Sequence, residues 1–143
     1  NAKKINMNIK IQGLSIERQT ETKFLGVILS YNLKWTTHIN VVLGKISKNT
    51  GIIAKVRHLL PESLTRMLYL TLVEPYINYC NIVWASSKKT TALNKIHMIQ
   101  KRYCRLITFS DYGAHTKPLF EKLNLLNVFN VYKCQLSCYM YNL

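Results

Sequence analysis

Acidic side chains are scarce in this chain: six Asp and Glu stand against 20 Lys and Arg among 143 residues, which leaves a formal net charge of +14 at pH 7. No two acidic residues are adjacent in the sequence. Two-metal catalysis needs carboxylates gathered at one site, so the sequence offers little for that chemistry. A positive field of this size favours anionic partners, which are nucleic acids or anionic membrane surfaces.

Metal-binding patterns of cysteine and histidine are also missing. The four cysteines include no Cys-x-x-Cys pair and the four histidines are widely spaced, so the spacing of a zinc site is absent. Cys134 and Cys138 are one helical turn apart, yet no histidine lies beside them. We therefore expect reduced, buried thiols, no cofactor in this chain, and an intracellular location in the cytoplasm or the nucleus.

Targeting and membrane-spanning segments are not expected either. The chain begins with Asn1 and has no short apolar run behind a basic start, so we expect no signal peptide and a piece of a longer protein. The stretch from Met67 to Ser87 lacks Lys and Arg and is long enough to span a bilayer. Glu74 and Pro75 in its middle are costly in hydrocarbon, so this stretch is expected in a protein core.

Hydrophobic residues at the start of the chain follow the period of strands. The alternation from Ile5 to Ile11 predicts a half-buried strand, Gly13 a turn, and Leu14 the start of a second strand. The continuous apolar run from Phe24 to Leu29 predicts a third strand that is buried on both faces. Three short strands make a poor independent sheet, so the rest of the sheet is expected elsewhere.

After Leu33 the spacing of hydrophobic residues changes from the period of strands to that of helices. Helices are predicted over residues 36–60, 62–84, 88–109, 118–122 and from 128 onward, with a break at Pro75 in the second. Thr36 or Thr37 is the expected N-cap of the first. The predicted fold class is α+β, mostly α: a short antiparallel strand unit in residues 1–31, then a bundle of about five helices in residues 32–143.

Two of these helices carry a basic face without any acid. At about 100° per residue, the arc of the 88–109 helix opposite its apolar residues holds Lys95, Lys101, Arg102 and Arg105. The arc of the first helix away from Ile46 and Ile53 holds Lys45, Lys48 and Lys55. Two such faces lining one groove predict contacts with a phosphate backbone and little sequence preference. The alternative is a solvated surface that only keeps the protein soluble.

Five groups of residues stand in a specific order along nearly the whole chain. They are Lys23–Leu29; Leu33-Lys34-Trp35 with His38-Ile39; Pro75–Cys80 followed by Val83-Trp84; Leu93-Asn94-Lys95 with Gln100-Lys101-Arg102; and His115-Thr116 with Pro118-Leu119-Phe120. Their order and spacing resemble the end of the polymerase domain in reverse transcriptases of non-LTR retrotransposons, which are RNA-directed DNA polymerases of LINE-type, jockey-like elements.

The resemblance implies that residues 1–31 are the last strands of the palm, with Phe24, Leu25 and Gly26 in the primer grip that holds the primer end. Residues 32–143 correspond to the thumb and the helical region after it, which close on an RNA-DNA or DNA duplex. The family's magnesium-binding aspartates lie upstream, and this sequence has no Asp-Asp pair. The chain alone is therefore not expected to polymerise DNA, and magnesium is expected only in the complete enzyme.

The expected partners are thus a nucleic-acid duplex and the remainder of the polymerase domain, without a membrane. One alternative is a helical module, or a remnant without independent activity, that docks another protein through apolar residues, including those from Met67 to Trp84. Another is a basic amphipathic protein that lies on a membrane surface.

Overall fold

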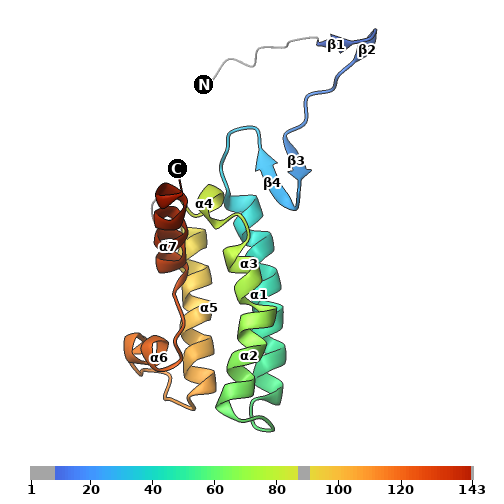
Figure 1. Ribbon diagram of the computed structural model, residues 1–143. Helices are drawn as coiled ribbons and strands as arrows, with labels where there is room; N and C mark the ends of the chain where they lie inside the picture. The colour runs from blue at the N-terminus through green and yellow to red at the C-terminus, as the bar shows by residue number, and fades with distance from the viewer. Residues whose placement is uncertain (1–8, 87–90, 143) are drawn as a thin grey trace.

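A computed structural model describes residues 9–86 and 91–142 and confirms the predicted fold class. The strands form two separate antiparallel pairs, β1 with β2 and β3 with β4. Helices α1, α2 and α5 lie side by side along the body, and α7 packs beside α5 (Figure 1). The bounds are β1 Lys10–Ile11, β2 Leu14–Ser15, β3 Glu21–Phe24, β4 Val27–Ser30, α1 Thr36–Val56, α2 Glu62–Leu72, α3 Glu74–Asn78, α4 Asn81–Trp84, α5 Thr91–Ile107, α6 Thr116–Lys122 and α7 Val128–Tyr141.

The core lies between the helices and follows the predicted helical faces. Ile39, Ile46 and Ile53 of α1 are buried against Ile96 and Ile107 of α5 and their neighbours in one cluster. The stretch from Met67 to Trp84 contributes buried side chains to the same cluster, as expected for a core segment. Among the described residues, no helix combines the length and the hydrophobicity needed to cross a bilayer.

The strand predictions are wrong in two respects. The apolar run expected as one strand buried on both faces is instead a hairpin turn followed by β4, because Leu25 and Gly26 both adopt positive φ, 45° and 84°. This pair of angles is typical of the two-residue turns that join antiparallel strands. The first strand pair is exposed rather than half-buried, with Ile11 61% and Leu14 75% accessible, because no helix covers it. The part of the expected first strand before residue 9 lies outside the described residues.

The helices start and end close to the residues predicted for their ends, with two exceptions. The expected break occurs between α2 and α3, with Pro75 in the first turn of α3. A second break at Cys80, whose φ is 51°, separates α3 from α4 and was not predicted. The predicted threonine cap of α1 is wrong, since no side chain caps that helix and the Thr37 hydroxyl instead donates to Glu21 of β3 at 2.6 Å.

Three contacts hold the β3–β4 hairpin against the helices. Besides the bond between Thr37 and Glu21, the backbone N–H of Ile28 donates to Nδ1 of His38 at 3.3 Å. The hydroxyl of Tyr79, which follows α3, donates to the carbonyl of Leu25 at the hairpin tip. His38 is 4% exposed and its ring meets the Trp84 ring edge-on, so the hairpin is bonded into the end of the core.

The side chain of Gln100 links three elements inside the core. It is 1% exposed, and its amide nitrogen donates to the hydroxyl of Tyr69 at 2.8 Å and to the carbonyl of Leu126 at 3.2 Å. Its oxygen accepts the backbone N–H of Val128, the first residue of α7, at 2.8 Å. Gln100 therefore fixes both the rotation of α5 about its axis and the start of α7.

The substitution Gln100→Leu is expected to lower the free energy of unfolding by about 1–3 kcal/mol, because it leaves buried donors and acceptors without partners. Urea denaturation of the wild type and the variant measures this loss. Gln135→Leu is the matched control, since Gln135 is half-buried and donates one bond, to the carbonyl of Asn78. An equal loss in the two variants contradicts the role assigned to Gln100.

Protonation of His38 is expected to destabilise the fold at low pH. Burial, and then the positive charge of Lys45, lower the pKa of His38, and burial likewise lowers the pKa of His97. The unfolded chain therefore takes up these protons first, near its ordinary pKa of about 6.5. Stability is complete above that pH and falls as the pH drops through the window between the unfolded and folded pKa values.

Urea denaturation between pH 7.5 and pH 5 tests this expectation. His38→Gln keeps an acceptor for Ile28 without a titrating group, so its stability should fall less on acidification than that of the wild type. His97→Gln should remove the remaining part of the slope when it is combined with His38→Gln. Identical pH profiles for the wild type and the double variant contradict the assignment.

Candidate nucleic-acid interface

The contact between α1 and α5 is the most extensive between helices of the described chain. Beside this contact, the small residues Ser47, Gly51 and Ala54 of α1 line a narrow groove of about 90 Å³ together with Ile99 and Leu106 of α5. An alanine Cβ at Gly51 would meet no atom within 4 Å, so the groove is open to solvent at this point. The outer side of the α1–α5 pair is thus a shallow channel between two ridges.

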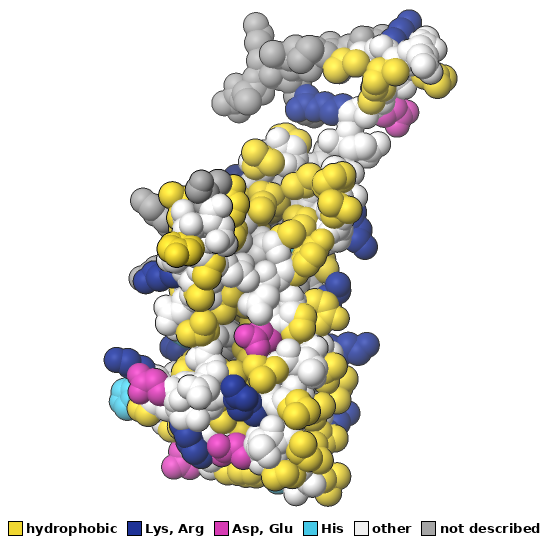
Figure 2. Space-filling model, viewed as in Figure 1, with side chains coloured by type: hydrophobic (Ala, Val, Ile, Leu, Met, Phe, Trp, Pro, Cys, Tyr) yellow, Lys and Arg dark blue, Asp and Glu magenta, His cyan; other side chains and the backbone are white. Residues whose placement is uncertain are grey.

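The first ridge belongs to α1 and carries two exposed lysines. Lys48 and Lys55 lie three residues before and four residues after Gly51, so their side chains flank the groove on one helix face. Both are exposed, and neither forms an ion pair among the described residues. Along the right-hand edge in Figure 2, beside α1, dark-blue side chains project outward.

The second ridge belongs to α5 and carries Lys95, Arg102 and Arg105. Arg102 is exposed and lines the groove itself. Lys95 lies two turns before it on the same face. Arg105 lies on the outer side of the helix, where its Nε donates to the carbonyl of Ala114 at 3.0 Å. The five residues Lys48, Lys55, Lys95, Arg102 and Arg105 are called the basic ridges below.

Two of the predicted contact residues lie elsewhere. Lys45 stands on the side of α1 that faces α3, where its Nζ lies 5.0 Å from the centroid of the Tyr76 ring. Lys101 is half-buried and lies one residue beyond Gln100, on the side of α5 that faces α6 and α7. Of the seven predicted cations, Arg102 lines the groove, Arg105 borders the depression beside it, and Lys48, Lys55 and Lys95 are exposed on α1 and α5. Lys88 and Lys89, also part of the predicted basic stretch, lie outside the described residues.

One cation that sequence reasoning missed joins the second ridge. Arg57 follows the last residue of α1, and its Nη1 donates to the carbonyl of Leu106 of α5 at 2.7 Å. Its guanidinium also lies 4.9 Å from the centroid of the Phe109 ring. Together with Arg102 and Arg105 it borders a larger depression of about 530 Å³ beside the groove. Both contacts of Arg57 are made across the fold, to residues about 50 positions away, so the sequence around it gave no signal for this position.

The residues that resemble a primer grip form the tip of the β3–β4 hairpin. Phe24 and Leu25 are 63% and 73% exposed, and the Cβ of a residue replacing Gly26 would lie 3.6 Å from the Tyr79 ring. The hairpin contacts the first turn of α1, while the groove starts at Ser47. At 1.5 Å per residue, about 15 Å of helix separate the two regions.

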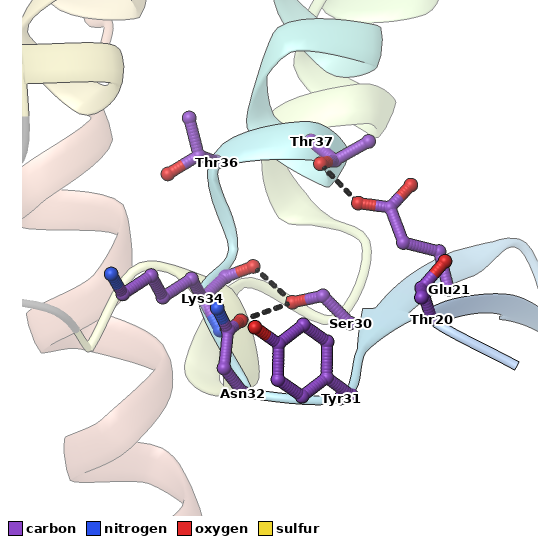
Figure 3. A pocket seen from close by; sticks show the side chains of 8 residues that line it. All are labelled: Thr20, Glu21, Ser30, Tyr31, Asn32, Lys34, Thr36 and Thr37. Atoms are coloured by element: carbon purple, nitrogen blue, oxygen red, sulfur yellow. Dashed lines mark hydrogen bonds between the residues drawn. The ribbon is translucent and has the colours of Figure 1, made fainter. Parts of the chain in front are cut away.

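A second depression, of about 280 Å³, lies where the hairpin meets the start of α1 (Figure 3). Its polar groups bond mainly to one another. Ser30 Oγ donates to the carbonyl of Lys34 at 2.7 Å and lies 3.0 Å from the side-chain oxygen of Asn32, and the Thr37 hydroxyl is held by Glu21. Its polar groups already have partners, so this depression serves to connect the hairpin to α1. It does not favour an anion, because Glu21 is an acid.

The described residues offer no cluster for metal binding. No group of three His, Cys, Asp or Glu side chains among them converges on one point. The expectation of buried thiols holds for Cys104 only, whose pKa is raised to about 12 by burial, because Cys80 and the two cysteines of α7 are exposed. The site consists instead of cations, a groove and aromatic rings, which suits binding of an anion.

Comparison of the chain with protein-family models, curated proteins and solved structures finds no match.

Proposed function

We propose that this chain is a non-catalytic, nucleic-acid-binding part of a reverse transcriptase of a non-LTR retrotransposon, and that it holds a template-primer duplex against the basic ridges. The observation that carries the proposal is the groove between α1 and α5, which Arg102 lines, together with the exposed Lys48 and Lys55 on α1 and Lys95 on α5, none of which forms an ion pair among the described residues. The order of elements, a hairpin followed by packed helices, is compatible with the resemblance to the end of a palm and a thumb.

The length of the ridges supports a duplex as the ligand. Lys95 and Arg105 are ten residues apart and Lys48 and Lys55 seven, so the ridge on α5 extends about 15 Å along its helix and the ridge on α1 about 10 Å. Duplex DNA presents one phosphate per about 1.7 Å of axis, or about six over the shorter ridge. Five cations facing this number of phosphates supply affinity through counterion release, while backbone contacts carry no sequence information.

No step of polymerisation is assigned to this chain. Magnesium in a polymerase is held by carboxylates, and the residues described here do not gather any such group. Two of the acids are instead bonded to other side chains: Glu21 accepts from Thr37, and Glu62 pairs with Lys122 at 2.8 Å. The proposed function is therefore limited to binding and positioning the duplex.

A second candidate function, docking to another protein, is favoured by the exposed apolar side chains of the strands. Ile11, Leu14, Phe24 and Leu25 are each more than 60% exposed on the two hairpins. The stretch from Met67 to Trp84, in contrast, buries Tyr69, Val73, Ile77 and Trp84 in the core. A docking surface is thus supported at the hairpins, and the rest of the polymerase domain is the partner that the resemblance implies.

The affinity for a 20-base-pair RNA-DNA hybrid or DNA duplex is expected to fall steeply with salt. If all five cations contact phosphates, the logarithm of the binding constant should decrease by about 4–5 per tenfold rise in salt. Filter binding between 50 and 300 mM NaCl measures this slope. The double variant Lys48→Ala/Arg102→Ala should reduce the slope by about two, alike for duplexes of unrelated sequence.

The matched control is Lys117→Ala/Lys133→Ala, which removes the same charge from exposed positions on α6 and α7. This control should keep the wild-type slope. A slope near zero for the wild type, or equal losses in the two double variants, contradicts the proposed interface.

A further inference from the structure

The depression beside the second ridge differs from the groove in size and lining. Its volume of about 530 Å³ lies in the range typical of sites for small organic groups. Met98, Ile99 and Leu106 supply apolar surface, while three arginines and the ring of Tyr112 form its border. No acid is among its lining residues in the described chain, and Asp111, which precedes Tyr112, is exposed.

The aromatic and cationic groups at the border are partly held in place. Arg57 is fixed by its bond to Leu106, and Arg105 by its bond to Ala114. The guanidinium of Arg105 lies 5.8 Å from the centroid of the Tyr112 ring, which is 91% exposed. Arg102 has no ion pair among the described residues and lies at the junction of the groove and the depression.

These groups match the chemistry of an unpaired nucleotide. A base presents two flat faces that stack on an aromatic ring, and its phosphate pairs with arginine. A paired base cannot enter, because its faces are covered by its neighbours in the duplex. The apolar floor and the open ring therefore favour a single-stranded end over the duplex that the groove accommodates.

We propose that the depression lined by Tyr112, Met98 and Leu106 binds a base of the single strand that extends from the duplex, with its phosphate at Arg102 and Arg105. This inference rests on the proposed nucleic-acid function and adds a second ligand form to it. The groove then holds the paired region, and the depression recognises the junction where pairing ends.

The experiment compares three DNA probes with the same 20-base-pair duplex: a blunt end, a five-nucleotide overhang, and a five-residue abasic overhang that keeps the phosphates without bases. Overhangs on the 5′ and the 3′ strand are tested separately. The full chain should bind the overhang probe of one polarity roughly tenfold more tightly than its abasic counterpart, because stacking of one base contributes a factor of that order. A 2-aminopurine in the overhang should change its fluorescence on binding.

Tyr112→Leu should abolish the difference between the overhang and abasic probes and keep the affinity for the blunt duplex. Tyr112→Phe retains a ring and should restore the difference. Because this side chain is exposed, neither substitution should disturb folding. Equal binding of the overhang and abasic probes by the wild type overturns the inference alone. Base-dependent binding of the overhang without any binding of the blunt duplex supports the inference and contradicts the proposed duplex interface.

Discussion

The close packing of α1 on α5 is the contact on which the rest of the structure depends. Beside this contact, small residues of α1, among them Gly51 and Ala54, line a groove together with Ile99 and Leu106 of α5. A Cβ at Gly51 meets no atom within 4 Å, so a large side chain there would extend into the open groove and narrow the channel between the helices. The same packing buries Ile39, Ile46 and Ile53 of α1 and Ile96 and Ile107 of α5, so stability and the shape of the channel come from one interface.

Polar groups inside the core determine which face of α5 points outward. Gln100 bonds to Tyr69 and to the start of α7, and the Tyr103 hydroxyl donates to the carbonyl of Thr65 at 2.9 Å. The rings of Tyr69 and Tyr103 pack with centroids 4.2 Å apart. Hydrophobic contacts alone tolerate small rotations of a helix, whereas directional bonds to several elements permit one orientation. Arg102 therefore faces the channel because Gln100, two residues earlier, is fixed in the interior.

The helices were predictable from the sequence, and the tertiary position of single cations was not. The spacing of isoleucines in α1 indicates its buried face, and Pro75 indicates a helix break. Both signals depend only on residues close together in the sequence. The turn at Leu25 and Gly26 was missed because a leucine at positive φ has no local signal, and Tyr79, 54 residues away, holds it. Lys45 was predicted to line the interface and Arg57 was not, yet the side chain of Lys45 lies against the Tyr76 ring and Arg57 bonds to the carbonyl of Leu106. Both contacts are made across the fold, so the sequence near each residue did not indicate them.

The clustering of positive side chains on α1 and α5 argues for a ligand more strongly than the net charge of the chain does. Surfaces that serve only solubility intersperse both signs, since like charges on neighbouring turns repel one another. The basic ridges hold five cations on facing helices, and the described acids at Glu21 and Glu62 are engaged elsewhere. Such a cluster loses stability through self-repulsion when it is empty, and binding of an anion removes that repulsion. A polyanion aligned with the channel neutralises both ridges together, which a single small anion cannot do.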